Sequence, residues 1–500
     1  MIKTDNKWDQ TADVIVIGYG LAGTAAAITA RENGAEVLVL EKSKQDNFHS
    51  NSSMAGLAVM GSNDIKQTIG HLDLLNRISG DTPWTEPEII HSMAGHLVDS
   101  PAWLQKLGGN ISFFSKGAEH IELPGADSLE GWSYAGMGFK LMELLHAKTK
   151  QLGITVAFDT AAKRLLTNLR GEITGVRVKT GEINQKDIRA IRGVILACGG
   201  FEFDERMKLN YLKVYPAFFT GTENNTGDGI RMAQDVGADL WHMNCVSARL
   251  VVKFPEMPWA IPVNLGGKGW TRRMMYNFVN TGQEPSGYIM VDRNCQRYTN
   301  ENFKGHSVYY ELGLFDTHQL SYPRVPSYWI FDQKRMEEGR LTNDMGGATG
   351  PHQLYHWSSD NGSEIEKGWI VTDRSMRGLA LKLSISPEAL EKTIGSYNRY
   401  CEQAQDPDFG RQPSTLTPLD KPPFYACRLW PGGPNTQGGP RRNVRSQVVN
   451  IDGEPIQHLY GAGELGSIFG MLYPIGGANL SECIASGRIA GENAAREKPI

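Results

Sequence analysis

The chain has 500 residues, of which 40% are hydrophobic and 21% are charged, with a formal net charge of −4 and a pI near 6.3. This composition is ordinary for a globular protein, and the weak negative charge argues against a nucleic-acid-binding protein. No apolar run approaches the ~18 residues of a membrane-spanning helix. The length predicts two domains, and the polar segment 1–11 leads us to expect a cytoplasmic protein.

The six cysteines are scattered along the chain and form no C-x-x-C pair. This spacing argues against an iron–sulfur cluster, an attached haem or a structural zinc. We therefore expect no metal site and interpret the cysteines as cytosolic thiols.

The first predicted elements are a strand, a glycine-rich turn, a helix and a second strand. Residues 14–17 are β-branched and apolar, residues 24–32 form an alanine-rich helical stretch, and residues 37–40 resemble the first strand. An Asn-Gly pair follows the helix and is typical of a helix end. The pattern predicts a βαβ unit.

The turn of this unit reads G-x-G-x-x-G. Gly18 permits the tight turn, Gly20 lets the backbone approach a pyrophosphate, and Gly23 lets the helix pack closely on the strand. Leu21 and Ala22 then lie at the helix N-terminus, which faces the anion. The motif alone also occurs in turns without a ligand, so its context decides the interpretation.

Glu41 follows the second strand, where a carboxylate can accept hydrogen bonds from a ribose diol. A carboxylate there would repel a 2′-phosphate, which argues against NADP. The strand, the helix, the second strand and the acid after it together predict a dinucleotide-binding site. The alternatives for the dinucleotide are NAD and FAD.

Further along the chain, helical periodicity and apolar runs predict more elements. We expect helices over 86–107, 138–153, 230–236 and 387–404, and strands over 154–158, 172–178, 187–190 and 193–197. From about 244 to 350, aromatic, proline and basic residues mix without a βαβ rhythm, which predicts an inserted domain. The expected organisation is a dinucleotide-binding domain over 1–243 and 351–500, with a capping (substrate) domain over 244–350.

Later motifs favour FAD over NAD because they suit a longer cofactor. Ala197 to Gly200 ends a strand with a glycine pair, and Thr226 to Gly229 is a tight turn with a carboxylate. Glu464 can bond ribityl hydroxyls, and the final helix, which starts near Asn479, would direct its positive N-terminus at the flavin. The candidate cofactor-binding residues are Gly18, Gly20, Leu21, Ala22, Gly23, Glu41, Lys42, Asn51, Ser52, Ala197, Gly199, Thr226, Asp228, Glu464, Asn479 and Leu480.

With these motifs, the chain resembles the flavoprotein family of fumarate reductases, succinate dehydrogenases and 3-ketosteroid dehydrogenases over nearly its whole length. The segments that carry the resemblance are 18–23, 41–42, 51–52, 197–200, 226–229, 296–301, 436–439 and 461–464. The resemblance implies an α/β fold, with a Rossmann-like FAD-binding domain and an inserted α+β capping domain. It also implies interconversion of C–C and C=C bonds next to a carbonyl or carboxylate, with an external electron acceptor or donor.

The resemblance also bears on how FAD is held. It places Asn51 and Ser52 near the FAD phosphates or ring. Some members carry a histidine there that bonds covalently to the flavin, but His49 lies one residue out of that register. We therefore expect non-covalent FAD, with covalent attachment as the alternative.

The dicarboxylate branch of the family carries H-G-A-N-R-x-G-G before the final helix, and its histidine and arginine hold the substrate. Aligned on Gly476 and Gly477, this chain has Gly470 and Pro474 at those two positions. The family's general-acid arginine is also missing after Glu301. Without charge-assisted bonds worth ~1.5–3 kcal/mol each, a dianion is a poor substrate.

The segment 473–477 instead resembles the Y-P-x-x-G of 3-ketosteroid dehydrogenases. There the tyrosine hydroxyl and the glycine N–H bind the ketone oxygen, which implies catalytic roles for Tyr473 and Gly477. Hydride would then pass between the β-carbon and flavin N5. The alternative is a loop tyrosine that only packs beneath the flavin.

The proton carrier is less defined by the sequence. The ketosteroid enzymes have a tyrosine after the N-E motif, where this chain offers His306, Tyr309 and Tyr310. His306 is the candidate we choose because an ordinary histidine titrates near pH 6.5. Tyr134 is a weaker candidate.

The inserted segment is rich in aromatic residues and arginine, which suits either its own core or a bulky apolar substrate. Arg249, Arg272 and Arg273 leave room for an anion. The aromatic residues are Trp259, Trp270, Tyr276, Phe278, Tyr322, Tyr328 and Trp329.

We therefore predict an FAD-dependent oxidoreductase that introduces or reduces a C=C bond α,β to a ketone. The expected small-molecule partner is a steroid or similar bulky cyclic enone, or the matching saturated ketone. One alternative is an enoate reductase that acts on an unsaturated carboxylic acid, and another is a flavoprotein electron-transfer subunit. A hydroxylating monooxygenase fits less well, because the C-terminal motif is of the dehydrogenase type.

Overall fold

The computed structural model describes residues 8–56, 59–77, 80–181, 184–265, 287–302, 306–342 and 346–500. The chain forms two compact units. Unit 1 comprises Met1–Leu212, Gly221–Ser247 and Asn435–Ile500, and unit 2 comprises Lys213–Thr220 and Ala248–Pro434. Unit 1 is therefore built from both ends of the chain.

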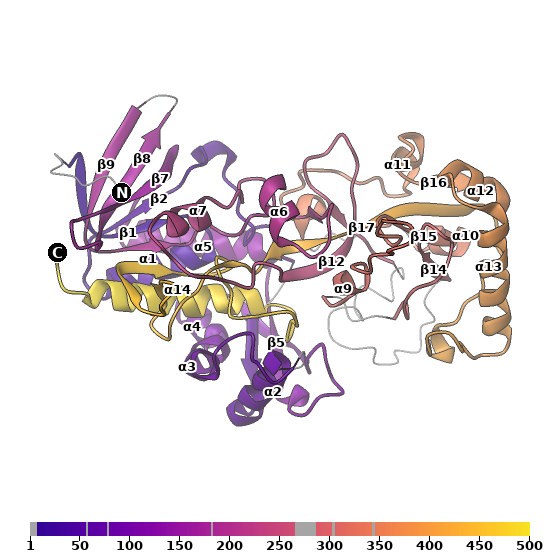
Figure 1. Cartoon of the computed structure of the whole chain (residues 1–500), viewed down its shortest axis with the longest axis horizontal. Coiled ribbons are helices and arrows are strands. Elements are labelled where there is room, and N and C mark those ends of the chain that lie inside the picture. Colours follow the sequence, from indigo (N-terminus) through magenta and orange to yellow (C-terminus); the bar gives the residue numbers. More distant parts are fainter. Residues whose placement is uncertain are drawn as a thin grey trace. The chain divides into compact units, whose positions relative to one another are not determined.

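An eight-stranded sheet is the centre of the described part of unit 1. Its order is β19-β20-β9-β1-β2-β6, with β8 joined to β9 and β7 to β8. Figure 1 labels β1, β2, β7, β8 and β9 of this sheet. The strands from β20 to β6 run parallel, and β19 pairs antiparallel with β20. The strands are β1 (Gln10–Ile17), β2 (Val37–Leu40), β6 (Thr155–Ala157), β7 (Thr160–Thr167), β8 (Ile173–Thr180), β9 (Asn184–Leu196), β19 (Gln447–Val449) and β20 (Pro455–Gly461).

The predicted strand–helix–strand unit is confirmed. β1 pairs with β2 from Val14↔Val37 to Ile17↔Leu40, and α1 (Leu21–Glu32) joins them. The apolar run of β1 is buried, as an interior parallel strand requires. Because β1, β2 and β9 are parallel, their carboxyl ends lie at one edge of the sheet, where the glycine-rich turn begins.

Two predicted elements differ from the structure. The expected helix 86–107 is two helices, α3 (Pro87–Val98) and α4 (Ser100–Lys106). Pro101 has no amide hydrogen for an intrahelical bond and is favoured in the first turn of a helix, where α4 has it, so it favours a break before α4. The expected separate strands 187–190 and 193–197 form the single strand β9. A bulge in its pairing with β1 absorbs one residue there.

The remaining elements of unit 1 lie outside this sheet. β3, β4 and β5 form a small antiparallel sheet of their own, and β11 pairs with β18. The bounds are β3 (Val59–Ser62), β4 (Ile111–Lys116), β5 (Leu129–Tyr134), β11 (Leu240–Trp241), β18 (Gly439–Pro440), α2 (Ile65–Arg77), α5 (Met137–Gln151), α6 (Glu205–Tyr211), α7 (Asp228–Asp235) and α14 (Ala478–Arg496).

The last helix packs directly on the first. A Cβ at Gly487 would lie 2.5 Å from the carbonyl oxygen of Ala22, and a Cβ at Gly491 would lie 2.3 Å from that of Ala26. Two glycines one turn apart therefore let the backbones of α1 and α14 approach each other. This contact joins the last helix of the chain to the helix that follows the glycine-rich turn after β1.

We expect Gly491→Ala to lower the free energy of unfolding by about 2 kcal/mol or more, because the new methyl group must push α14 away from α1. Urea denaturation measures the effect. The matched control is Gly395→Ala in α13 (Pro387–Glu402), where only Arg399 Nη1 lies within 4 Å, at 3.9 Å. Alanine there should stabilise by about 1 kcal/mol through helix propensity. Equal stability of the two variants would contradict the close packing.

Unit 2 is built around a seven-stranded sheet in its described part, with the order β13-β12-β17-β15-β14 and with β10 and β16 also paired to β17. Tyr328 and Ile330 of β15 share a core with Leu379 of α12 and Tyr397 of α13. The bounds are β10 (Phe218–Phe219), β12 (Val246–Val252), β13 (Ile261–Pro262), β14 (Tyr288–Val291), β15 (Ser327–Asp332), β16 (Val371–Asp373), β17 (Phe424–Thr436), α9 (Val308–Glu311), α10 (Gln333–Glu337), α11 (Gly362–Glu366) and α12 (Met376–Leu383). Across the described residues, no helix combines the length and the apolar character needed to cross a bilayer.

Candidate functional site

A cavity with an empty volume of about 800 Å³ lies in unit 1, where β1, β2 and β9 end. The predicted residues that line it are Gly18, Gly20, Leu21, Ala22, Glu41, Lys42, Asn51, Ser52, Ala197, Gly199, Asp228 and Glu464. Gly23, Thr226, Asn479 and Leu480, which were also predicted, are not among its lining residues. The fold thus gathers at one cavity residues that are far apart in the sequence.

The glycine-rich turn is sterically tight at two of its three glycines. Gly18 has φ +104°, and a Cβ there would lie 2.3 Å from the carbonyl oxygen of Ala197. A Cβ at Gly23 would lie 2.0 Å from the carbonyl oxygen of Gly18. At Gly20 the nearest atoms would be 3.7 Å away, in Ser50 and Ser52, so this glycine leaves open space. Gly18 and Gly23 serve packing, and Gly20 leaves room for a ligand beside the α1 N-terminus.

Glu41 and Lys42 connect the first turn to the T-G-D-G turn. Glu41 accepts the backbone N–H of Tyr19 at 3.2 Å. Lys42 Nζ donates to Thr226 Oγ1 at 2.9 Å and to Asp228 Oδ2 at 2.7 Å. Burial opposes ionisation of Asp228, but the charge and hydrogen bond of Lys42, the charge of Lys163 and the Thr226 hydrogen bond together lower the pKa of that carboxyl. Asp228 is therefore a carboxylate at the cavity. Thr226 is outside the lining and accepts a hydrogen bond from Lys42.

Asn51 and Ser52 form another wall of the cavity. Ser52 Oγ accepts the N–H of Leu21 at 3.2 Å, at the start of α1. Asn51 Oδ1 accepts the N–H of Thr222 at 2.7 Å, and Asn51 Nδ2 donates to Glu464 Oε2 at 3.2 Å. This small-residue segment therefore holds together the N-terminal and C-terminal parts of the site.

Two buried carboxyl groups interact electrostatically at the cavity, Glu464 in its lining and Glu202 outside it. Burial raises the pKa of Glu464 to about 8, and the neighbouring Glu202 carboxylate adds to the rise. Burial also raises the pKa of Glu202, whose Oε1 accepts the Oγ1–H of Thr436 at 2.8 Å. Sequence reasoning missed Glu202, because a glutamate after a glycine pair carries no signal of burial. Glu464 is thus a neutral donor at pH 7, suited to a hydroxyl-rich ligand.

We expect the apoprotein to lose stability as pH rises from about 4.5 to about 8. In that range folded Glu464 keeps a proton that the unfolded chain releases, so the free energy of unfolding decreases with pH. One proton contributes at most about 1.4 kcal/mol per pH unit. Glu464→Gln should flatten the profile measured by urea denaturation, and Glu454→Gln, at an exposed glutamate, should leave it unchanged. A profile equally steep in Glu464→Gln would contradict the raised pKa.

The loop before α14 holds Tyr473 in a defined position. Tyr473 is 7% exposed, and its hydroxyl oxygen accepts the N–H of Asn479 at 2.8 Å, within the first turn of α14. Gly477 caps this helix with φ +94°. The carbonyl oxygen of Pro474 accepts the N–H of Glu119 at 3.0 Å. The phenol therefore lies at the positive end of a helix.

The other predicted residues of this region have structural contacts. The side chain of Asn479 bonds Gln437 at 3.2 Å and Asn435 at 2.8 Å. Leu480 belongs to the core of unit 1 that also contains Ala22 and Cys483. Their predicted contacts with a cofactor stay predictions. Of the predicted aromatic and arginine residues, Trp270, Arg272, Arg273, Tyr276 and Phe278 lie outside the described residues.

The candidate proton carriers are divided between the units. His306 belongs to unit 2 and is 7% exposed. Tyr309 Oη, also in unit 2, donates to the carbonyl oxygen of Val214 at 3.4 Å. Tyr134 ends β5 in unit 1, where burial raises its pKa.

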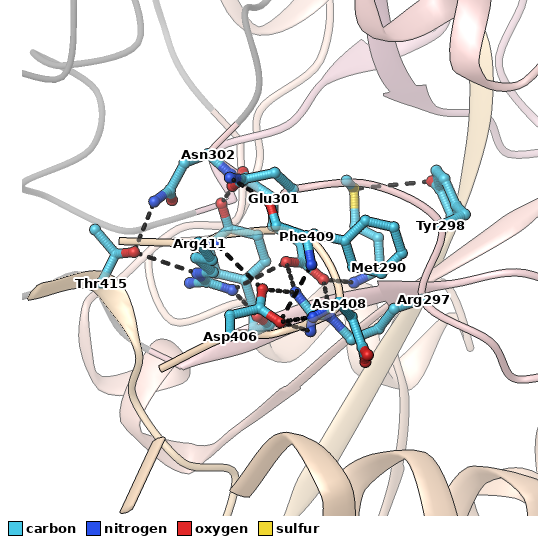
Figure 2. A network of polar contacts seen from close by, with 12 residues as sticks. Met290, Arg297, Tyr298, Glu301, Asn302, Asp406, Asp408, Phe409, Arg411 and Thr415 are labelled. Atoms are coloured by element: carbon cyan, nitrogen blue, oxygen red, sulfur yellow. Dashed lines mark hydrogen bonds and ion pairs between the residues drawn. The ribbon is translucent and has the colours of Figure 1, made fainter. Parts of the chain in front are cut away.

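The segment 296–301 builds a buried ion network in unit 2 (Figure 2). Arg297 donates to both oxygens of Glu301, at 2.8 and 2.6 Å, and to both oxygens of Asp406, at 3.1 and 2.9 Å. Arg411 donates to the carbonyl oxygen of Tyr288 at 2.8 Å. The side chains of Arg297, Glu301 and Asp406 are at most 3% exposed. This motif therefore contributes to the interior of unit 2.

Comparison with known proteins identifies the family. The model described as "FAD binding domain" matches residues 13–480, so the chain belongs to this family of FAD-binding proteins. The NADH:fumarate oxidoreductase of Klebsiella pneumoniae is 26% identical to this chain. The alignment covers 97% of this chain and 48% of that protein. The vinyl phenol reductase of Lactiplantibacillus plantarum is 27% identical over 97% of this chain and 96% of that protein.

Among solved structures, the 3-ketosteroid Δ1-dehydrogenase of Sterolibacterium denitrificans in complex with 1,4-androstadiene-3,17-dione aligns with a TM-score of 0.82 and 20% identity. The alignment covers 98% of this chain and 100% of that one. The predicted fold is confirmed, and so is the predicted class of FAD-dependent oxidoreductases that act on CH–CH bonds. The cavity suits FAD, since it combines a glycine turn at a helix N-terminus with the buried neutral acid Glu464.

Proposed function

We propose that the protein binds FAD non-covalently in this cavity and introduces or reduces a C=C bond α,β to the ketone of a bulky cyclic enone such as a steroid. Bound FAD supplies the two-electron acceptor or donor for hydride transfer. The observation that carries the proposal is the position of the Tyr473 hydroxyl at the N-terminus of α14, where it accepts the N–H of Asn479.

This position makes Tyr473 a suitable donor to a carbonyl oxygen. Hydrogen bonds in a chain polarise one another, so a phenol oxygen that accepts an N–H gives its own proton more strongly to the next acceptor. The dipole of α14 acts in the same direction. In the proposed complex, Tyr473 and the N–H of Gly477 polarise the ketone and stabilise the enolate that forms as the α-proton leaves. His306 is the proposed carrier of that proton.

The lining residues supply the proposed contacts to FAD. The backbone of Gly18 to Ala22, with the N-terminus of α1 and Ser52, holds the pyrophosphate. Glu41 accepts hydrogen bonds from the ribose. Asn51 and Glu464 bond the ribityl hydroxyls. His49 Nε2 lies 3.1 Å from Glu223 Oε2, an interaction that supports a structural role for this histidine and non-covalent FAD. Precipitation of the holoprotein with acid should then release the flavin into the supernatant.

An enoate reductase is the second candidate, and the similarity to NADH:fumarate oxidoreductase favours it. A carboxylate substrate needs a cation or several donors to replace its hydration. Gly470 and Pro474 offer neither beside Tyr473, which is why we rank the ketone first.

The test is a substrate panel on purified holoenzyme. Anaerobically reduced enzyme is mixed with 4-ene or 1-ene 3-ketosteroids, simple cyclic enones, or enoates such as fumarate and cinnamate, and reoxidation of the flavin is followed by absorbance. Oxidised enzyme is mixed in parallel with saturated ketosteroids and an artificial electron acceptor. Fast reoxidation by cyclic enones supports the proposal. Reoxidation by enoates alone would replace it with the second candidate.

A further inference from the structure

His242 lies between the segment at Trp84 and the loop that carries Tyr473. It follows β11 and is 6% exposed. Its Nδ1 lies 2.7 Å from the carbonyl oxygen of Ser467, and its Nε2 lies 2.7 Å from the carbonyl oxygen of Trp84. The imidazole stacks on Trp241, with ring centroids 4.6 Å apart and planes at 7°. The ring is therefore fixed in orientation, with a carbonyl oxygen at each end.

The backbone at His242 indicates that this side chain has a particular role. Its φ of +53° lies in the left-handed region, which glycine and asparagine adopt more easily than other residues. A glycine would fit this backbone with less strain, but the carbonyl oxygens of Ser467 and Trp84 would then lose the imidazole between them. An unfavourable backbone conformation that is kept for the sake of a side chain points to a function of that side chain.

Both carbonyl neighbours of the ring are hydrogen-bond acceptors, but a neutral imidazole has only one N–H. Burial lowers the pKa of His242 more than the two carbonyl oxygens raise it, and the charge of Arg442 lowers it further, so the ring is neutral at pH 7. At the Nε2 end, the Thr85 hydroxyl lies 3.4 Å away and can supply a hydrogen. At Nδ1, the Ser467 carbonyl oxygen is the one hydrogen-bond partner among the described residues. The single hydrogen therefore belongs on Nδ1.

Ser467 connects this hydrogen bond to Tyr473. The Ser467 hydroxyl oxygen accepts the N–H of Phe469 at 3.1 Å, and the hydroxyl donates to Glu482 Oε2 at 2.5 Å. The ring of Phe469 packs edge-to-face against that of Tyr473, with centroids 6.1 Å apart and planes at 74°. A displacement of Ser467 would therefore reach the phenol through one intervening side chain.

The segment at Trp84 contacts the same loop. A Cβ at Gly470 would lie 2.6 Å from Trp84 Cγ, so the indole and a larger residue at 470 exclude each other. Thr85 Oγ1 donates to the carbonyl oxygen of Ile468 at 2.7 Å. The loop is thus held by hydrogen bonds at 467 and 468 and by packing at 470, which restricts its movement just before Tyr473.

We infer that His242 is a positioning residue for Tyr473, and that its Nδ1–H, bonded to the Ser467 carbonyl oxygen, holds the loop so that the phenol lies at the N-terminus of α14. The inference rests on the proposed function, in which the Tyr473 hydroxyl polarises the substrate ketone. His242 acts through Ser467 and Phe469 rather than on the substrate. Removal of the Nδ1–H should misplace the donor, and a small displacement of a catalytic group lowers the rate.

The first test measures kcat and KM of holoenzyme variants with 4-androstene-3,17-dione and a reduced artificial electron donor. His242→Phe keeps a ring on Trp241 and should lower kcat about tenfold, with KM within about threefold of wild type. His242→Asn places an amide nitrogen near the position of Nδ1 and should restore kcat to within about threefold of wild type. His242→Gln places it near the position of Nε2 and should stay slow. His242→Gly suits the backbone but has no donor, so it should stay slow as well.

The second test measures the loop directly, by hydrogen exchange of residues 467–477 in the holoenzyme. His242→Phe should speed the exchange of this segment about fivefold or more, because a tethered loop opens less often. The matched control is His71→Phe in α2. His71 is also buried, and its Nδ1 lies 2.9 Å from the carbonyl oxygen of Pro124. His71→Phe should leave the exchange of 467–477 unchanged and keep kcat within about twofold of wild type.

The outcomes separate the inference from the proposed function. If His242→Phe matches His71→Phe in both kcat and exchange, or if His242→Asn is no faster than His242→Gln, His242 does not position the loop. In a Tyr473→Phe background, His242→Phe should lower kcat little further, and an equal loss in both backgrounds would mean that it does not act through Tyr473.

If Tyr473→Phe retains full turnover while exchange of 467–477 speeds up in His242→Phe, His242 holds the loop but the proposed function is wrong. Flavin content and thermal stability show whether each variant is folded. The comparison of His242→Asn with His242→Gln decides the question if His242→Phe does not fold.

Discussion

Replacing Tyr473 with phenylalanine should lower kcat/KM for the enone about 10²–10³-fold, the usual effect of losing one donor to a developing oxyanion. The ring and its packing against Phe469 remain, but the hydroxyl that accepts the Asn479 N–H is lost. Because the interaction strengthens as negative charge develops on oxygen, kcat should decrease more than KM increases. Steady-state assays with an artificial electron carrier and single-turnover flavin absorbance measure the two effects separately.

The matched control is Tyr460→Phe. Tyr460 is a buried tyrosine of unit 1 in β20, and its hydroxyl bonds Glu497 rather than the loop before α14. This variant should retain kcat/KM within about twofold of wild type, while both variants keep their flavin. Undiminished turnover in a flavin-loaded Tyr473→Phe enzyme would show that the phenol does not polarise the substrate.

Removing Asp406 should lower the free energy of unfolding by about 3–5 kcal/mol, as expected when one partner of a buried ion pair is deleted. Burial alone would raise the pKa of Asp406, but its bonds to Arg297 lower it, so the carboxylate is ionised in the folded protein. In Asp406→Ala, Arg297 keeps its charge, with Glu301 as its one carboxylate partner among the described residues (Figure 2). The backbone N–H of Arg411 loses its acceptor as well. Urea denaturation followed by intrinsic fluorescence measures the change.

An exposed ion pair of the same unit serves as the control. Arg377 and Glu388 are bonded at 2.7 Å, but their side chains are 55% and 69% exposed. Glu388→Ala should leave the urea midpoint unchanged, because such pairs are screened by solvent. Similar losses in Asp406→Ala and Glu388→Ala would mean that burial does not set the strength of the network.

The βαβ unit of the nucleotide-binding core could be predicted from the sequence because each motif in it determines the structure of residues close to it in the chain. The β-branched run at 14–17, the glycines of the first turn and the acid at 41 each fix backbone or burial within a few residues. Gly487 and Gly491 permit the close contact between α14 and α1, but nothing in the sequence near them identifies α1 as the partner. The helix predicted over 86–107 is two helices, α3 and α4, and the break between them lies next to Pro101.

The contacts that the sequence could not predict are those between distant segments. Glu202 acts on Glu464 through space, and Trp84 borders Gly470 although the two are far apart in the sequence. Composition around either residue is unremarkable, so only the fold reveals these pairs. The roles of Tyr473, Gly477 and His306, and the assignment of 244–350 to a substrate domain, stay predictions.

The cavity at the first turn has a consequence for biosynthesis. The residues that line it come from both the first part of the sequence, such as Ile17 and the turn after it, and the last part, such as Glu464 and Cys483. During translation the first strands are synthesised long before Glu464 and Cys483, so the nascent chain has only part of the residues that line the cavity. Cofactor capture is therefore a late event that follows nearly complete synthesis, and truncation within α14 should yield protein that does not retain flavin.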